Sequence, residues 1–527
     1  MGLKRMMKVA CFTMMACLVL SGCSQSDVAH EAQAEGTAVN ASADNADEKV
    51  LNLALFWLDS NVDPINGWNG WALNRSGIGE NLIQIDENMQ FKMGIAESYR
   101  QLDDCTVEFT IRDNAYFHNG KKVDALACKK SIERALSDSD RMDVKFDVDA
   151  ITAEGQVLTI KTTKAYPTLL NLLADTVYIL VDADAAGESD FAYKPVCTGP
   201  FKIIEFDADK GMVLHKHEQY WGAQTNVDVV NVKYIQDGAT RTMALQSGEI
   251  DIATQINARD LELFKDNDDF VVQQGPNLRV FLLRLNMATP YMSELKFRQA
   301  LCYGMDKETY ATELVSGQAA KGPFNDQLSF GYDGEDMYKY NPDKANALLD
   351  ELGYMDTDGD GIRECNGENI VIRYMSRTNH GSDANNIGIA MQQQYKEIGL
   401  GMVVDQLESY SDRSKAGDFD MMWERWTSAP TSDCQYFIDS GYKTDASGNA
   451  GKYSNAALDG IIDQLNVTFD KAERDVLGKE ASKILIEDVA TLFLYYQEGN
   501  VVTNQRVEGV YRYMSEIYYI DDRVMLK

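Results

Sequence analysis

The sequence predicts an α/β fold, on three observations. First, strand-like runs such as VLNLALFW, TVEFTIR and VDVVNVKYI alternate along the chain with helical stretches such as VDALACKKSIERAL and DKANALLDELG. Second, the 527 residues are 45% hydrophobic and 25% charged, which is typical of a folded protein with a core. Third, at about 100–200 residues per domain, the length allows roughly two to four domains.

The first element, residues 1–23, is predicted to be a secretory signal. Basic residues precede an apolar run from Val9 to Leu20, and this run is shorter than the roughly 20 residues that span a bilayer. The LSGC at its end resembles the lipobox of bacterial lipoproteins, which implies that Cys23 is acylated and anchors the protein outside the cytoplasm. The alternative is a plain signal peptide with an incidental cysteine.

Residues 24–48 are predicted to be a flexible tether. The segment is rich in Ala, Ser, Asn, Asp and Glu, contains no aromatic residue and shows no period, so it cannot bury a core. The folded part is therefore expected to begin at about residue 49.

Local signals place the next elements. Asn119 and Gly120 predict a turn after an aromatic strand, and Asp124 is placed to cap the following helix. Further on, Asn341 and Pro342 open the stretch DKANALLDELG, which Gly353 is expected to end. These signals indicate scaffold and not a ligand site.

Charge and cysteines limit the function. Asp and Glu outnumber Lys and Arg by 82 to 50, and the formal charge of −32 would repel nucleic acid over the whole surface, which excludes nucleic acid as a partner. Six cysteines follow Cys23 without metal-finger spacing, and they are too few for a disulfide scaffold, so most are expected to be free thiols. The sequence leaves their pairing open. They are Cys105, Cys128, Cys197, Cys302, Cys365 and Cys434.

A family resemblance rests on six stretches that occur in a fixed order. They are TVEFTIRDNAYFHNGKKVDA, CTGPFKIIEF, HEQYWG, TRTMALQSGEIDIA, FRQALCYGMDKETY and KANALLDELGY. From about Leu51 to the C-terminus the chain resembles the extracytoplasmic solute-binding proteins of peptide and nickel ABC importers. The resemblance implies a type II periplasmic-binding-protein-like fold: two lobes joined by a hinge, with an extra subdomain.

The same resemblance implies where the parts lie and what they do. The first lobe would comprise residues 49–70, 196–275 and 490–527, the extra subdomain 71–195, and the second lobe 276–489. The protein would be a monomer that captures a solute between the lobes and delivers it to permease and ATPase subunits. It would perform no chemistry and require no cofactor.

The segment DPINGWNGWALNR sets Trp68, Trp71 and Arg75 in a turn-rich stretch after the first strand. Large rings there could stack on a ligand, and the planar fork of an arginine matches a carboxylate. The alternative, that these residues cap the core, stays open.

A second candidate segment is ERWTSAPTSD, residues 424–433. In the family, a loop after a second-lobe strand faces the cleft, and many oligopeptide binders carry Ala-Asp there, with the aspartate pairing with the peptide amine. This chain has Ala429 and Pro430 instead and resembles the nickel branch, which implies that Arg425 or Trp426 contacts the ligand. The alternative is that the segment closes a strand.

The match to the nickel branch is partial. Arg141 corresponds to an arginine that this branch uses in its cleft, where it would neutralise a carboxylate of an organic chelator. Thr176 stands where the nickel branch has a second carboxylate-binding arginine. The ligand is therefore predicted to be a nickel chelate or similar metallophore, with a short peptide as the alternative.

The chain has no Gly-x-Ser-x-Gly elbow, HExxH helix or Gly-rich phosphate loop, so an enzyme is disfavoured, and a secreted hydrolase with hidden paired carboxylates is a remote alternative.

The stretch DTDGDGIRE alternates Asp356, Asp358 and Asp360 as at the start of a calcium loop, but position twelve is Gly367 and not glutamate. A solvated acidic loop is favoured over a structural calcium site.

Overall fold

The computed structural model describes residues 48–315, 317–378 and 382–527. Cys23 and nearly all of the predicted signal and tether lie outside the described residues. The fold is mixed α/β, as predicted. Among the residues described, no helix combines the length and the apolar composition needed to cross a membrane.

An eleven-stranded sheet runs through the described part of the chain. Ten of its strands follow the order β17-β16-β18-β12-β19-β11-β1-β10-β9-β8, and β13 (Gly317–Ala319) pairs with β19 off this path. The strands at the first-lobe end are β1 (Val50–Leu55), β8 (Phe201–Asp207), β9 (Gly211–Lys216), β10 (Val229–Tyr234) and β11 (Ile252–Thr254). Those at the other end are β16 (Val371–Arg377), β17 (Gly401–Leu407) and β18 (Met421–Thr427).

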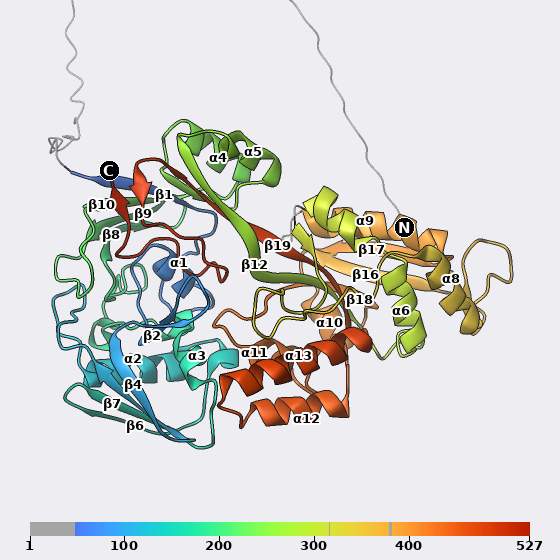
Figure 1. The fold of residues 1–527 in the computed structure, drawn as a ribbon, viewed down its shortest axis with the longest axis horizontal. Helices are drawn as coiled ribbons and strands as arrows, with labels where there is room; N and C mark the ends of the chain where they lie inside the picture. The colour runs from blue at the N-terminus through green and yellow to red at the C-terminus, as the bar shows by residue number, and fades with distance from the viewer. Residues whose placement is uncertain (1–47, 316, 379–381) are drawn as a thin grey trace, which may run out of the picture. The chain divides into compact units, whose positions relative to one another are not determined.

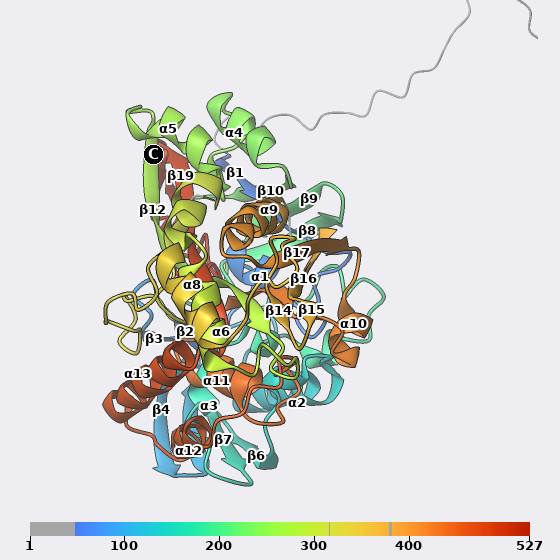
Figure 2. The ribbon, with the colours of Figure 1, turned by 90° about the vertical axis from the view of Figure 1, so that its right-hand side faces the viewer.

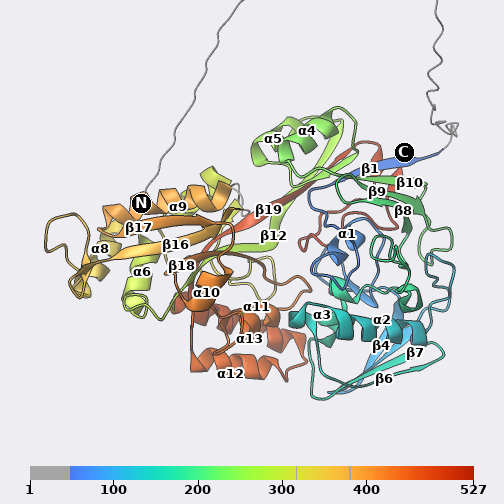
Figure 3. The same cartoon turned by 180° about the vertical axis from the view of Figure 1, so that it is seen from behind.

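Two long antiparallel strands connect the two ends of this sheet. β12 (Phe270–Leu285) and β19 (Thr491–Asn504) pair along most of their length, and their register shifts between Pro276 and Val280. In Figures 1 and 3 the pair crosses from the first-lobe strands to those of the second lobe. The ladder is therefore interrupted where the chain passes between the lobes.

The second lobe covers both faces of its part of the sheet. Alternate residues of β12 point to opposite sides: Phe281 and Leu283 pack into one core cluster, Val280 and Leu282 into another. The first cluster includes α6 (Leu295–Tyr303), α8 (Pro342–Glu351) and α9 (Ser382–Glu397), and the second includes α11 (Gln435–Tyr442), α12 (Ala456–Leu465) and α13 (Lys471–Glu487). Figures 1 and 2 show α11, α12 and α13 gathered away from α9.

The remaining second-lobe elements are short. They are α7 (Lys307–Thr309), a π-helical turn (Tyr310–Val315), the hairpin of β14 (Glu364–Cys365) and β15 (Glu368–Asn369), and α10 (Ser411–Ala416).

A separate four-stranded sheet, ordered β4-β5-β7-β6, forms within residues 71–195. Its elements are β4 (Ala96–Asp103), β5 (Thr106–Ile111), α2 (Ala125–Asp138), β6 (Val148–Glu154), β7 (Val157–Thr162) and α3 (Leu169–Leu173), with the hairpin of β2 (Ile83–Ile85) and β3 (Phe91–Met93) beside them. The first lobe adds α1 (Gly70–Arg75), α4 (Gly238–Gln246), α5 (Ala258–Lys265), β20 (Val507–Glu508) and β21 (Met525–Leu526). The exact domain boundaries stay a prediction.

Local signals in the sequence define the predicted helix ends. The carboxylate of Asp124 accepts a hydrogen bond from the backbone N–H of Ala127 at 2.8 Å, and α2 starts there. Asn341 caps α8, and Gly353 after it has φ +76°, a conformation that glycine adopts without strain. The six cysteines of the described part are free thiols.

The extra subdomain contacts the second lobe directly. The side-chain amide of Asn171 in α3 donates to the carbonyl of Thr431 at 2.6 Å, and the hydroxyl of Ser432 donates to the carbonyl of Met89 at 2.7 Å. Ile85 and Met89 also share a core cluster with Phe437 of α11. These contacts hold the two parts together beside the segment 424–433.

Glu80 is a buried acid that joins three segments of the first lobe. Its carboxylate accepts hydrogen bonds from Thr198 at 2.9 Å, Tyr220 at 2.9 Å and the indole of Trp221 at 3.1 Å. Burial raises the pKa of Glu80 from 4.5 to about 7 despite these bonds. The folded protein therefore binds this proton more tightly than the unfolded chain does.

This shift gives a pH prediction. The proton on Glu80 stabilises the fold fully below pH 4.5, and this contribution is lost as the pH rises to about 7. The loss amounts to about 3 kcal/mol. Urea unfolding at several pH values between 5 and 8 should show it in the wild type and not in Glu80→Gln, while the exposed control Glu188→Gln keeps the wild-type slope. An unchanged slope in Glu80→Gln would contradict the assignment.

Candidate ligand-binding site

Arg75 lies on α1 and is surrounded by aromatic rings. It is only 2% exposed, and its Cζ lies 4.9 Å from the ring centre of Trp71, 5.0 Å from that of Phe56 and 5.1 Å from that of Tyr519. Its Nε donates to the backbone carbonyl of Glu516 at 2.9 Å. Within the described part of the chain, Arg75 forms no ion pair, so cation–π contacts carry much of its stabilisation.

Glu516 connects this first-lobe arginine to β12. Its carboxylate pairs with Arg279 at 3.1 Å and accepts a hydrogen bond from the side-chain amide of Gln255. Glu516 is 5% exposed and has φ +59°, an uncommon backbone conformation for a residue other than glycine. Both carboxylate oxygens are thus already engaged.

Arg425 lies on β18 near this carboxylate without pairing to it. The side chain is exposed, yet its pKa is lowered, first by desolvation and then by the charge of Arg279 and, to a smaller extent, of Arg377. Among the residues described, Arg425 forms no ion pair.

Arg377, like Arg425, is an arginine that forms no ion pair among the residues described. It ends β16, which runs parallel to β18, so both arginines lie toward the carboxyl ends of their strands. Its Nε is buried without a hydrogen-bond partner, and no ion pair to it forms within the described ranges. Parallel strands commonly bind ligands at this edge. The edge is suited to an anion.

We call the residues Trp71, Arg75, Arg279, Arg377, Arg425 and Glu516 the arginine set. Three arginines influence one another here while a single carboxylate, Glu516, is saturated by two donors. The set therefore carries an excess of positive charge in a protein of net charge −32. An anionic ligand would relieve this repulsion.

A second group, the tryptophan set, comprises Trp68, Arg141, Trp426 and Tyr436. The guanidinium of Arg141 lies 3.8 Å from the ring centre of Trp68, which is 47% exposed. The rings of Trp426 and Tyr436 lie 6.0 Å apart. Trp68 also meets Trp71 edge to face at 6.1 Å, so the two sets are contiguous.

Arg141 is fully engaged inside the protein. It pairs with Asp175 at 3.0 Å and with Asp143 at 2.6 Å, and it is 7% exposed. Burial lowers its pKa, but the charges of Asp175 and Asp143 more than compensate and raise it. Arg141 therefore supports the ring of Trp68 and, in this structure, has its charge neutralised by the protein.

The structure thus brings all six predicted residues into two adjoining sets. Trp71, Arg75 and Arg425 belong to one and Trp68, Arg141 and Trp426 to the other, but their contact with a ligand stays a prediction. Trp426 packs partly into the core beside Phe437, with ring centres 5.5 Å apart, and its indole donates to Glu424 at 2.9 Å. Thr176 is buried and lies against Gly70 at the start of α1.

Sequence reasoning missed Arg279, Arg377, Tyr436 and Glu516. Arg377 could have been identified from the sequence, because it ends a strand-like run in the second lobe. Glu516 had none, since its importance arises from contacts with residues some 240 and 440 positions away, at Arg279 and Arg75.

In the acidic loop, calcium binding stays a prediction, but the acids that lie close together are not the three that alternate in the sequence. Ligand oxygens of Asp356, Asp358 and Glu364 lie within 4.8 Å of one another, so Glu364 and not Asp360 completes the group. Asp360 instead accepts a hydrogen bond from the amide of Asn369 at 2.6 Å.

Comparisons with known proteins agree with this architecture. The model for bacterial extracellular solute-binding proteins, family 5 Middle, matches residues 90–449. The nickel-binding protein NikA of Staphylococcus aureus is 29% identical over 456 residues, covering 86% of this chain and 89% of NikA. The oligopeptide-binding protein AppA of Bacillus subtilis is 24% identical over 454 residues, covering 82% and 83%.

A solved structure confirms the fold. NikA from Staphylococcus aureus in complex with Ni(L-His)2 matches with a TM-score of 0.75 and 26% identity, covering 91% of this chain and all of that one. The two-lobed fold class and the resemblance inferred from the six ordered stretches are both confirmed. The chain therefore belongs to the family 5 bacterial extracellular solute-binding proteins.

Proposed function

We propose that this protein is the binding component of an ABC importer and captures a carboxylate-bearing nickel chelate between its lobes. The observation that carries the proposal is that Arg377 and Arg425 influence each other and form no ion pair within the described residues, while the carboxylate of Glu516 near Arg425 is engaged by Arg279 and Gln255. Two guanidinium groups that form no ion pair in the described part of the chain match two carboxylates, because each can donate parallel hydrogen bonds.

The charge balance favours the chelate over a peptide. The free amine of a peptide needs a carboxylate, and the single acid of the arginine set already pairs with Arg279 and Gln255. Burying an unpaired ammonium is costly. A short peptide is the second candidate, supported by the similarity to AppA.

Nickel would enter as cargo and not as a resident cofactor. Neither set contains histidine or cysteine, so the chelator would supply the nitrogen and oxygen donors that nickel prefers. The protein would supply the arginines for the outer carboxylates and the exposed ring of Trp68 for stacking. Closure of the lobes along β12 and β19 would bury the complex.

The wider setting follows from the family and from the N-terminal segment. An acylated Cys23 would tether the protein to the outer side of the membrane, and residues 24–48 would allow it to reach a permease with its ATPase. The acidic loop is proposed, at most, as a structural calcium site. None of these features requires the protein to carry out chemistry.

A thermal-shift panel tests the ligand class. Nickel with L-histidine should raise the melting temperature, whereas nickel alone, L-histidine alone and tri- or tetrapeptides should not. At a ligand concentration 100 times Kd, the gain in unfolding free energy is about 2.7 kcal/mol. Stabilisation by peptides without stabilisation by chelates would favour the peptide alternative, and turnover of any ligand would favour the hydrolase.

A further inference from the structure

A small cavity lies within the first lobe and its subdomain. Its walls come from residues 74–92, 200–220 and 513–522, with none from the second lobe. The free volume is about 20 Å³, enough for one or two groups the size of a water molecule. The polar residues at its walls include Asn74, Glu80, Lys92, Tyr220, Tyr513 and Asp522.

Asn74 presents an unsatisfied amide to this cavity. The residue is 1% exposed, and neither its Oδ1 nor its Nδ2 has a hydrogen-bond partner among the described residues. A buried amide that lacks partners destabilises a protein, so such groups are normally bonded to protein, water or ion. The amide of Asn74 therefore indicates an occupant.

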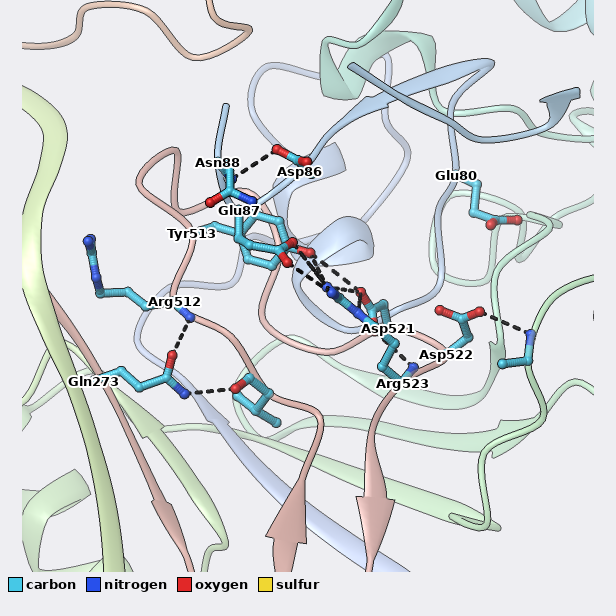
Figure 4. Close-up of polar contacts among 12 residues, drawn as sticks. Glu80, Asp86, Glu87, Asn88, Gln273, Arg512, Tyr513, Asp521, Asp522 and Arg523 are labelled. Atoms are coloured by element: carbon cyan, nitrogen blue, oxygen red, sulfur yellow. Dashed lines mark hydrogen bonds and ion pairs between the residues drawn. The ribbon is translucent and has the colours of Figure 1, made fainter. Parts of the chain in front are cut away.

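Two carboxylates face the same space. Glu80 and Asp522 both line the cavity, and in Figure 4 their carboxylates lie on the same side of the ion pair of Asp521 with Arg523 at 2.7 Å. One oxygen of Asp522 accepts a hydrogen bond from the backbone N–H of Ala223 at 3.0 Å. Its other oxygen has no partner within the described part of the chain.

Within the described ranges, no cation forms an ion pair with either of these two acids. Lys92 lines the cavity but forms no ion pair among the residues described, and Arg523 is engaged by Asp521 and Glu87. The remaining titratable groups at the walls are Tyr220, which donates to Glu80, Tyr513 and Tyr518. Burial raises the pKa of Glu80, and the nearby charge of Asp522 adds to this rise.

We propose that this cavity binds one small monovalent cation of the size of potassium or ammonium. The ion would contact the carboxylates of Glu80 and Asp522 and the Oδ1 of Asn74, beside the ring of Tyr220. Oxygen donors suit a hard cation, and aromatic rings stabilise a cation further. A divalent ion usually needs more carboxylates, and in the described residues the group of three close acidic ligands lies elsewhere, in residues 356–364.

The test is the melting temperature of the full chain at pH 8, where Glu80 is charged. Potassium chloride and ammonium chloride are titrated separately against tetramethylammonium chloride at equal ionic strength, since that ion is too large for the cavity. A saturable rise of several degrees with potassium, ammonium or both is expected, and it should shrink at pH 5.5, where Glu80 holds its proton. Equal melting temperatures in all three salts at pH 8 would overturn the proposal.

Variants distinguish ion binding in the cavity from general effects of salt on the melting temperature. Asn74→Leu and Asp522→Asn should each abolish the difference between salts, while Glu188→Gln, an exposed first-lobe control, keeps it. Leucine has a similar shape and removes an amide without partners, so the fold should tolerate it. If Asn74→Leu does not fold, Asp522→Asn decides alone. A wild-type response in the folded variants contradicts the site.

Discussion

Arg425→Met is expected to weaken binding of the nickel chelate on the order of 100-fold, or about 3 kcal/mol. The substitution keeps the aliphatic length of the side chain and removes the guanidinium that a ligand carboxylate would meet. Arg425 forms no ion pair within the described residues, so the loss cannot come from a broken internal pair. Isothermal titration calorimetry with nickel and L-histidine measures the change.

The same substitution should stabilise the protein without ligand. Arg279 and Arg377 both lower the pKa of Arg425, which means that their charges repel it in the empty site. Removing the cation that both of these arginines repel relieves this repulsion, as is common where function demands a destabilised site. The expected signature is therefore a higher melting temperature together with weaker binding.

Arg413→Met is the matched control for this pair of effects. Arg413 is also a second-lobe arginine, but it pairs with Asp405 at 2.8 Å and Asp418 at 3.0 Å on the surface. Surface pairs contribute about 0–1 kcal/mol, so neither binding nor stability should change much. Equal affinity of Arg425→Met and Arg413→Met for the chelate would remove Arg425 from the site.

Local patterns predicted the scaffold well for a physical reason. The caps at Asp124 and Asn341 and the turn at Gly353 depend on residues within four positions of one another, so the sequence displays them directly. The ordered family stretches then implied the two-lobed arrangement, which no local pattern could have shown. The long pairing of β12 with β19 joins segments more than 200 residues apart.

The site was predicted only in part, because the state of a charged residue depends on tertiary partners. Arg141 and Arg425 look alike in the sequence, yet one pairs with two carboxylates and the other with none in the described part of the chain. Arg141 is neutralised by Asp143 and Asp175. Arg425 instead lies near two other cations, Arg279 and Arg377. Sequence spacing identifies an arginine but not its counter-ion.

Arg141→Met is expected to destabilise the fold by about 3–5 kcal/mol. Arg141 and Asp175 are both nearly fully buried, so removal of the guanidinium leaves an uncompensated charge on Asp175. Asp143 is partly exposed and can be solvated instead. Urea unfolding measures the loss, and a change below 1 kcal/mol would show that this pair does not hold the subdomain together.

A second substitution separates structure from recognition. The carboxylate of Asp175 accepts a hydrogen bond from the backbone N–H of Val177 at 3.0 Å. Asp175→Asn removes the uncompensated charge but keeps an oxygen that can accept this bond. The double variant Arg141→Met/Asp175→Asn should therefore regain much of the lost stability. Binding can then be measured in a protein that is folded but lacks the guanidinium under Trp68.

The binding result decides how Arg141 acts on the site. If Arg141 only supports the ring of Trp68, its loss and that of Trp68→Leu should be strongly non-additive, because both substitutions remove the same stacked unit. If Arg141 also contacts a ligand carboxylate, the two losses should add, and the affinity of the rescued variant should fall for ligands with carboxylates more than for those without. The internal pairing of Arg141 with Asp143 and Asp175 favours the first outcome, since a guanidinium that two carboxylates already neutralise offers little charge to a third.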